Sequence, residues 1–331
     1  MGDYRTSNIL GHVGLENLGF TCFLNAALQC IHNIEEFRQL LLSNYHKVIS
    51  RLTPLTETLS MLFAEMCKSE SSVAPNAFLH VIRKYWVEYN PGTQQDAMDF
   101  LSFLLWRIHA EVLVCTKYCM TEFMSISSDA IFFQESEFVV RNPNIKLSAH
   151  EEVLNAWERS AHSAVTSLLG HQLITFRTCG NQYCSYESVT CDTSLILSLD
   201  IPKACKRENI EECLDLLCNG NKSVDGPCPL CAVEGSTTLK YKLGRLPPYL
   251  IVHIKRFQQI GAEKKKVDTK INCSEQLNMK PYAMQGLQST EEYELVGLIV
   301  HTGSLERGHY IAHCKREQRF KESSANIQLL T

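Results

Sequence analysis

Apolar residues recur at helical spacing through the first third of the chain, so that each segment presents one apolar face. The segments with this pattern are 23–31, 55–66, 77–85 and 96–109. The last one carries Asp96 and Asp99 in its first turn, where acidic side chains interact favourably with the helix dipole. The pattern predicts a helical N-terminal region.

From about residue 170 the pattern changes to short runs of leucine, β-branched and aromatic residues, which are typical of strands. The runs are 173–177, 195–199, 250–254, 293–301 and 310–314, and one short helix, 210–218, interrupts them. Helices followed by strands predict an α+β fold. Residues 115–150 lack a clear period and predict an irregular insertion, whereas the charged run 261–266 predicts a solvated loop.

Composition limits the class of protein. The chain has 331 residues, 45% of them hydrophobic, which is enough to bury a large core and argues against long disorder. A net charge of −4 provides no general attraction to nucleic acid or to an anionic membrane. No run approaches about 18 apolar residues, and the first residues lack the apolar stretch of a secretory signal. We therefore expect no direct nucleic-acid partner and no membrane span.

Cysteine is the unusual component. Fifteen is an odd number, so these residues cannot all pair with one another. Without a secretory signal, we expect a reducing setting in the cytoplasm, the nucleus or both. There the cysteines serve as core residues, metal ligands or a nucleophile, and their local contexts must decide which.

Cys22 has the context of a nucleophile. It follows a loop marked by Gly14 and Gly19 and stands at the start of the first predicted helix. The positive end of the helix dipole stabilises a thiolate at such a position. Asn17 lies in the preceding loop, where its side-chain amide can donate to an oxyanion. The alternative is a buried structural cysteine, which is the usual role of a single cysteine.

A nucleophilic cysteine needs a base, which in such enzymes is a histidine distant in sequence. Among the twelve histidines, His309 follows a glycine-bearing loop and opens a predicted strand, a geometry that can project an imidazole into a cleft. His301 and His313 are nearby alternatives. His253 lies inside an apolar strand and is better explained as a core or sheet histidine.

Two cysteine pairs have the spacing of metal ligands. Cys179 and Cys184 form a C-x4-C pair, Cys228 and Cys231 form a C-x2-C pair, and 43 residues separate the pairs. Four thiolates suit a closed, tetrahedral, structural zinc site with no position left for substrate. Cys191 is an alternative ligand, although it lies at the start of a strand. A nucleic-acid zinc ribbon competes with this interpretation, but no basic cluster flanks the pairs.

Four segments together resemble the ubiquitin-specific protease family of deubiquitinating cysteine proteases. In chain order they resemble its cysteine box, its glutamine–aspartate box, its lysine–arginine–phenylalanine strand and its histidine box, at residues 14–29, 94–105, 246–257 and 300–310. The motifs occur in the order of the family and extend over nearly the whole chain. Such agreement argues strongly against chance.

The resemblance implies an α+β, papain-like fold with a helical thumb, a palm and zinc-bearing fingers. The implied single catalytic domain covers 1–331, with the thumb at about 10–115, the insertion at about 115–150, the fingers at about 171–245 and the palm at 246–331. The implied activity is thiol-dependent hydrolysis of the bond after the C-terminal glycine of ubiquitin. Ubiquitin and ubiquitinated proteins are the implied partners, with membership of a multiprotein complex as a further expectation.

Position by position, the resemblance makes Cys22 the nucleophile, His309 the base and Asn17 the oxyanion-hole amide. It also implies that substrate is bound by three residues, namely Asp96, Gln95 and Tyr310. Family members often bind zinc with two cysteine pairs at the tip of the fingers, although their first pair is usually C-x2-C. This strengthens the assignment of one structural zinc ion to four cysteines: Cys179, Cys184, Cys228 and Cys231.

The C-terminal segment departs from the family pattern. A papain-like triad needs a third residue to orient the histidine, and alignment on Phe320 places Ser323 at that position instead of Asp or Asn. The chain stops at Thr331 without the expected closing aromatic strand, so the last palm strand is predicted to be missing. Either the C-terminus is altered, or the protein is a pseudoenzyme that retains ubiquitin binding. Phe20, where the family usually has a small or polar residue, is a milder departure.

Overall fold

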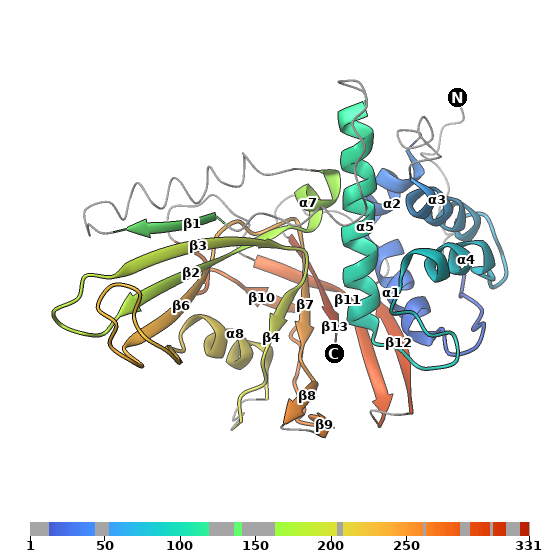
Figure 1. The fold of residues 1–331 in the computed structure, drawn as a ribbon. Helices are drawn as coiled ribbons and strands as arrows, with labels where there is room; N and C mark the ends of the chain where they lie inside the picture. Colours follow the sequence, from blue (N-terminus) through green and yellow to red (C-terminus); the bar gives the residue numbers. More distant parts are fainter. Residues whose placement is uncertain are drawn as a thin grey trace.

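The computed structural model describes residues 13–43, 53–118, 136–140, 163–203, 208–260, 263–284, 292–304, 307–315 and 325–330. Helices gather at one end, a mixed sheet lies in the middle, and a second sheet extends to the opposite end (Figure 1). We call these parts the thumb, the palm and the fingers. The predicted α+β fold is confirmed.

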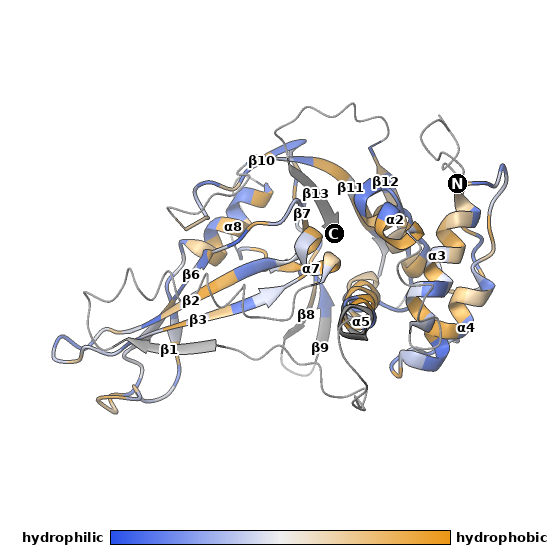
Figure 2. Ribbon diagram, turned by 90° about the horizontal axis from the view of Figure 1, so that it is seen from above, coloured by the Kyte–Doolittle hydropathy of each residue, from blue (hydrophilic) through white to orange (hydrophobic). Residues whose placement is uncertain are grey.

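Within the described residues, the helices of the thumb are α1 (Cys22–His32), α2 (Glu35–Leu42), α3 (Pro54–Met66), α4 (Asn76–Tyr85) and α5 (Ala97–Tyr118). All four predicted helical segments are confirmed, although α5 continues well beyond residue 109. The helix α2 was not predicted. Hydrophobic α5 lies between the other thumb helices and the palm strands (Figure 2). Its residues Phe100, Leu101, Leu104 and Leu105 are fully buried because they share one helical face.

A buried carboxylate joins α5 to α3. Glu111 is 3% exposed, and its Oε2 accepts hydrogen bonds from the Thr56 backbone N–H at 2.8 Å and the Thr56 hydroxyl at 2.7 Å. Arg107 donates to the other carboxylate oxygen at 3.1 Å. The N-terminus of α3 provides unsatisfied N–H groups that favour a negative charge, so Glu111 remains compatible with a buried position.

The palm sheet has the order β10–β11–β13–β7–β4, with β12 also paired to β11. Its strands are β4 (Leu197–Leu199), β7 (Tyr249–Ile254), β10 (Gln276–Asn278), β11 (Glu292–Gly303), β12 (Gly308–Cys314) and β13 (Ala325–Leu330). Strand β13 lies between β11 and β7 and runs parallel to both. The prediction that the last palm strand is missing is therefore wrong. The prediction looked for an aromatic strand, but Ile327, Leu329 and Leu330 provide the apolar pattern of a central strand.

Strand β7 of the palm is buried on both faces, and its successive residues point to opposite sides of the sheet. In β7, Tyr249 and Ile251 pack into the core shared with the thumb. Leu250 and Val252 pack into a second core, which α8 (Ile210–Cys218) covers. The continuous apolar run of β7 follows from this double burial.

The fingers contain a sheet of order β1–β3–β2–β6–β5. Its strands are β1 (Ser136–Val140), β2 (His171–Cys179), β3 (Glu187–Ser194), β5 (Lys222–Val224) and β6 (Thr237–Leu243), and α7 (Ala164–Leu169) precedes β2. Strand β1 pairs with β3 inside the range predicted as an irregular insertion, so that range contributes a sheet edge. Strand β4, from inside the range assigned to the fingers, pairs with β7 of the palm. The boundaries of thumb, fingers and palm otherwise stay a prediction.

The charged run at 261–266 differs from its prediction as a solvated loop. Residues Glu263–Lys266 form β9, which pairs with β8 (Phe257–Ile260) as an antiparallel hairpin. Lysines are common on exposed strand edges because their charge discourages further pairing. In the sequence, however, a run of lysines has the same polar character as a loop.

Among the described residues, no helix combines the length and apolar character of a membrane span.

Candidate active site and metal centre

Cys22 is the first residue of α1, as predicted from the glycine-bearing loop before it. The thiol-bearing residue is buried, with 6% of its surface exposed. Two side chains on α1 hold the preceding loop: Asn25 Nδ2 donates to the Glu16 carbonyl at 3.0 Å, and Gln29 Nε2 donates to the Val13 carbonyl at 2.9 Å. One helix therefore carries both the cysteine and the contacts that shape the loop beside it.

The side-chain amide of Asn17 has a fixed orientation. Its Oδ1 accepts hydrogen bonds from the Gly19 N–H at 3.2 Å, the Thr21 N–H at 3.1 Å and the Thr21 hydroxyl at 3.1 Å. Because the oxygen side of the amide is occupied, the NH2 group faces the other way and stays available as a donor. Asn17 is exposed in the loop that leads to Cys22, and its amide is therefore a candidate donor to an oxyanion.

Helix α1 packs against strand β12, and the first residues of both elements lie at the same end of this contact. Cys22 is therefore near the start of β12. At the far end, the sulfurs of Cys314 and Cys30 are 3.9 Å apart. At the near end, Tyr310 is close enough for the charge of Cys22 to act on its phenol. His309, adjacent to Tyr310, is exposed. In the described part of the chain no hydrogen bond joins the Cys22 thiol to the His309 ring, a state common in catalytic sites without substrate.

Asp96 and Tyr310 meet beside Cys22. Asp96 precedes α5, and its Oδ1 accepts the Met98 N–H at 2.7 Å as a helix cap. Burial raises the pKa of the Asp96 carboxyl to about 6, and the neighbouring Asp99 adds to the shift. Burial, together with the charge of Asp96, raises the pKa of the Tyr310 phenol. Gln95 also lies in this loop and donates to Thr93 Oγ1 at 3.4 Å.

A pocket next to these residues includes side chains that the sequence prediction did not assign to the site. Arg256, Phe257 and His301 line it together with Asp96 and Tyr310. The His301 ring lies 4.6 Å from the Tyr310 ring and 5.4 Å from the Phe257 ring, centroid to centroid. Pairing of β11 with β12 places His301 opposite Tyr310. A hairpin predicted from the two strand patterns and the turn between them is the sequence signal that could have placed His301 in this pocket.

The other histidine predictions have clear outcomes. Burial and the nearby Lys266 lower the pKa of His301, which favours the neutral form of its ring. His253 lies in β7 with its Nδ1 3.3 Å from Ser198 Oγ, and burial lowers its pKa to about 4, as expected of a sheet histidine. His313 is exposed further along β12. Ser323, predicted at the third triad position, lies outside the described residues.

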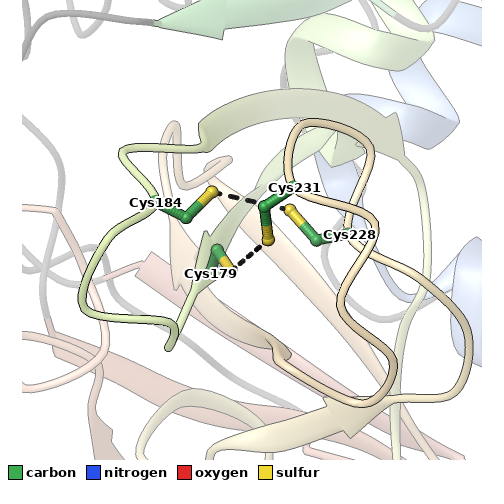
Figure 3. A group of neighbouring side chains, drawn as sticks. All are labelled: Cys179, Cys184, Cys228 and Cys231. Atoms are coloured by element: carbon green, nitrogen blue, oxygen red, sulfur yellow. Dashed lines mark hydrogen bonds between the residues drawn. The ribbon is translucent and has the colours of Figure 1, made fainter.

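Four cysteine sulfurs converge at the tip of the fingers, all within 4.8 Å of one another (Figure 3). The sulfurs of Cys179 and Cys231 are 3.7 Å apart, and those of Cys184 and Cys228 are 3.9 Å apart. Zinc–sulfur bonds of about 2.3 Å in a tetrahedral site place sulfurs about 3.8 Å apart. The four sulfurs therefore fit a metal ion. Cys191, the alternative ligand, lies on β3 and outside the cluster.

The two loops that carry the cysteines also donate to the sulfurs. The Asn181 N–H approaches the Cys179 sulfur at 3.5 Å, and Asn181 Nδ2 approaches the Cys231 sulfur at 3.7 Å. The backbone N–H of Val233 lowers the pKa of the Cys231 thiol to about 6. Donors of this kind stabilise thiolates and orient ligands around a metal. The twelve cysteines whose side chains the structure describes form no disulfides.

Comparison with known proteins agrees with this geometry. The sequence profile of "Ubiquitin carboxyl-terminal hydrolase" matches residues 13–325. The chain belongs to the ubiquitin carboxyl-terminal hydrolase family. Ubiquitin carboxyl-terminal hydrolase 21 of Homo sapiens is 29% identical over 323 residues, which cover 92% of this chain and 56% of that protein. The hydrolase Usp2 of Drosophila melanogaster is 28% identical and is matched over 96% of this chain and 32% of its own length.

Solved structures show that this hydrolase-family chain has the same fold as its relatives. A chain of the yeast SAGA DUB module superposes with a TM-score of 0.66 at 25% identity, covering 92% of this chain and 61% of the other. A SAGA Ubp8/Sgf11/Sus1/Sgf73 DUB module bound to ubiquitin aldehyde superposes with a TM-score of 0.66 at 24% identity, covering 92% of this chain and 62% of the other. The chain spans a little over half the length of the hydrolase 21 relatives it matches.

Proposed function

We propose that this chain is a thiol-dependent deubiquitinase that cleaves the bond after the C-terminal glycine of ubiquitin. The observation that carries the proposal is the end of the α1–β12 pair, where Cys22 opens α1 and His309 lies at the start of β12. Asn17 presents a free NH2 group beside the cysteine. Nucleophile, base and oxyanion donor are thus contributed by neighbouring segments, as acyl transfer requires.

The reaction follows from these positions. The Cys22 thiolate attacks the glycine carbonyl, and the negative charge that develops on its oxygen is stabilised by the Asn17 Nδ2–H. The protonated His309 ring gives its proton to the leaving amine as the C–N bond breaks, which leaves a thioester on Cys22. Water then attacks the thioester with His309 as base, releasing ubiquitin and restoring the thiol.

Polar side chains near Cys22 are the candidates for binding the tail of the substrate. Asp96 and Tyr310 line the same small pocket, and Tyr310 lies close enough to Cys22 for an electrostatic interaction. At pH 7 the Asp96 carboxyl, with its pKa of about 6, is mostly ionised and can accept hydrogen bonds from the tail. Gln95, in the same loop, adds a side-chain amide that can also bind the tail.

The metal of the fingers is proposed to be one zinc ion held by Cys179, Cys184, Cys228 and Cys231. The ion would supply a structural cross-link between the loop after β2 and the loop between β5 and β6. The support is the sulfur spacing and the donors around the sulfurs. Since four thiolates close the site, substrate has no position on the metal.

Ubiquitin and ubiquitinated proteins are the proposed partners. Similar chains occur in structures of multiprotein DUB modules, one of them bound to monoubiquitin, which makes assembly with other proteins a reasonable further proposal. We also propose a reducing compartment, the cytoplasm or the nucleus, which agrees with the absence of disulfides among the twelve cysteines whose side chains the structure describes.

A ubiquitin probe with a C-terminal electrophile tests the activity. We expect the probe to label Cys22 covalently, and the Cys22→Ala variant to bind ubiquitin without being labelled. The matched control is Cys67→Ala, which alters a thiol remote from the site, on the C-terminal side of α3, and should be labelled like the wild type. Absence of labelling, or equal labelling of Cys22→Ala, would exclude the nucleophile. Ubiquitin binding without labelling of the wild type would instead identify a non-catalytic ubiquitin-binding protein.

A further inference from the structure

Gln94 joins two loops that lie 214 residues apart and meet beside the candidate base. Its Oε1 accepts a hydrogen bond from the Gly308 N–H at 2.7 Å, and its Nε2 donates to the Gly308 carbonyl at 2.6 Å. One side-chain amide therefore holds both polar groups of one backbone residue. We call this pair of bonds the Gln94–Gly308 contact. Gly308 immediately precedes His309.

The position of Gly308 in the hairpin explains why it needs such a partner. The Ser304 N–H donates to the Arg307 carbonyl across the β11–β12 hairpin, and Gly308 lies opposite Gly303 in the next pair. Successive residues of an antiparallel pair direct their polar groups alternately toward the partner strand and away from it. The polar groups of Gly308 thus face away from β11, where Gln94 takes the place of a further strand.

The backbone before His309 has little freedom to move. A Cβ on Gly308 would lie 2.0 Å from His301 Nε2 and 2.7 Å from the Thr302 carbonyl oxygen, so His301 and β11 close one side. Lys266 Nζ donates to the Gly303 carbonyl at 2.7 Å and holds the opposite strand of the hairpin. Gln94 closes the remaining side. A displacement of about 1 Å in a reacting group can cost about 10²-fold in rate.

We propose that Gln94 is a positioning residue for His309. It acts through the Gly308 backbone and does not touch the substrate, in contrast to the role proposed for Asp96 two residues later. The inference rests on the proposed function, because the position of His309 matters for rate only if His309 is the base.

Steady-state hydrolysis of ubiquitin carrying a C-terminal fluorogenic amide tests the role. Gln94→Ala removes both hydrogen bonds, and we expect kcat to fall about 10- to 100-fold while KM changes less than about 2-fold. The matched control is Gln39→Ala, since Gln39 is an exposed glutamine that bonds only within α2. It should retain the wild-type kcat. Thermal unfolding of both variants separates lost positioning from lost folding.

Gln94→Glu provides a signature that a purely structural role would not produce. A protonated glutamic acid has one donor and one acceptor and copies the amide, whereas its carboxylate faces the Gly308 carbonyl with a second acceptor. The kcat of Gln94→Glu relative to Gln94→Ala should therefore rise as pH falls from about 8 toward the carboxyl pKa of about 4.3. Asp96, His301 and Lys266 are present near the hairpin in both variants, so the ratio removes the pH dependence that these groups contribute equally to both.

The outcomes separate this inference from the proposed function. If the wild type is active and Gln94→Ala keeps its kcat within about 2-fold, or the Glu-to-Ala ratio stays flat with pH, the positioning role is wrong while the deubiquitinase proposal stands. If the ubiquitin probe does not label wild-type Cys22, the proposed deubiquitinase activity and the positioning role of Gln94 are both wrong. Amide hydrogen exchange at Gly308 then still reports the contact itself, with faster exchange expected in Gln94→Ala.

Discussion

The four-cysteine cluster and the candidate active site are built in opposite ways. The cluster draws its ligands from two short loops, each of which carries two cysteines, and the sulfurs lie within 4.8 Å of one another. The active site collects Cys22, Asp96 and His309 from three segments that are far apart in the sequence. Its geometry depends on the packing of α1 against β12 and on backbone contacts such as the one between Gln94 and Gly308.

The difference predicts different responses to damage. Loss of one cysteine ligand should be seen as lost metal and lost stability, because a structural metal contributes its binding energy to the folded state. Damage around the active site should be seen mainly as lost rate, because small displacements leave the core packed while they spoil the alignment of reacting groups. Four substitutions, from the largest expected effect to the smallest, test this contrast.

Cys228→Ser should have the largest effect. Cys228 is a buried member of the cysteine cluster, at 2% exposure, and a proposed ligand. We expect the variant to lose about one equivalent of zinc and about 4 kcal/mol or more of unfolding free energy. Metal analysis and chemical denaturation measure both. The matched control is Cys191→Ser, a buried cysteine on β3 that should keep its metal; retention of zinc by Cys228→Ser and loss by Cys191→Ser would reverse the ligand assignment.

Gly308→Ala should act on rate with a smaller effect on folding. The added Cβ meets the Thr302 carbonyl oxygen at 2.7 Å, so the backbone before His309 must shift. We expect kcat for the fluorogenic ubiquitin substrate to fall about 10²-fold. Gly14→Ala is the control, because a Cβ there has no atom within 4 Å. Equal rates of Gly308→Ala and the wild type would show that this backbone position is unimportant to the base.

Asp96→Asn should weaken catalysis yet stabilise the fold. The carboxyl has a pKa of about 6 in the folded chain and about 3.9 in unfolded chains, so its ionised form is disfavoured by folding. This cost is fully present above pH 6 and disappears as pH falls toward 4. Asparagine avoids the cost and still caps α5. We expect a gain of about 1 kcal/mol at neutral pH, with kcat/KM reduced about 10-fold.

Denaturation of Asp96→Asn and Asp99→Asn at neutral and acidic pH checks that prediction. Asp99 is an exposed neighbour on α5, so its variant should show much less dependence of stability on pH. A loss of stability in Asp96→Asn at neutral pH would contradict the burial of an ionised carboxylate at this site.

Phe20→Asn should have the smallest effect. Phe20 has a φ of 54°, in the left-handed region, and half of its side chain is exposed. Asparagine tolerates this conformation better than phenylalanine, so we expect a gain of about 0.5–1 kcal/mol in unfolding free energy. Phe20→Ala also removes the ring but does not favour the left-handed region. Equal stability of the two variants would show that backbone strain at Phe20 is negligible.

Several parts of this molecule could be predicted from local patterns. The helices α1, α3 and α4 and the short helix α8 are found where apolar residues recur with the helical period, because that period records one buried face. Cys22 could be placed at a helix start from the glycines before it. The two cysteine pairs could be found because ligands in short loops keep a characteristic spacing.

Other parts could not. The pattern at the end of the chain lacked aromatic residues, and the prediction of a missing palm strand followed, yet β13 fills the space between β11 and β7. Lysines made β9 look like a loop. From the sequence, His301 was only an alternative to His309 as the base. The register of β11 with β12 instead places it in the pocket beside Tyr310. Strand β13 was missed because one of its partners, β7, lies far away in the chain. Strand β9 and His301 lie in local hairpins, whose pairing the pattern of apolar residues did not reveal.

By itself, the sequence determined the fold class, the helix that opens with Cys22, the two cysteine pairs and, through four motifs, the family. Only the tertiary structure decided that β13 enters the middle of the palm, that Asp96 is half-buried beside Tyr310, and that Gln94 holds Gly308. The physical reason is that periodicity and spacing record how each segment buries its own side chains. Contacts between segments more than 200 residues apart depend instead on which surfaces the completed core brings together.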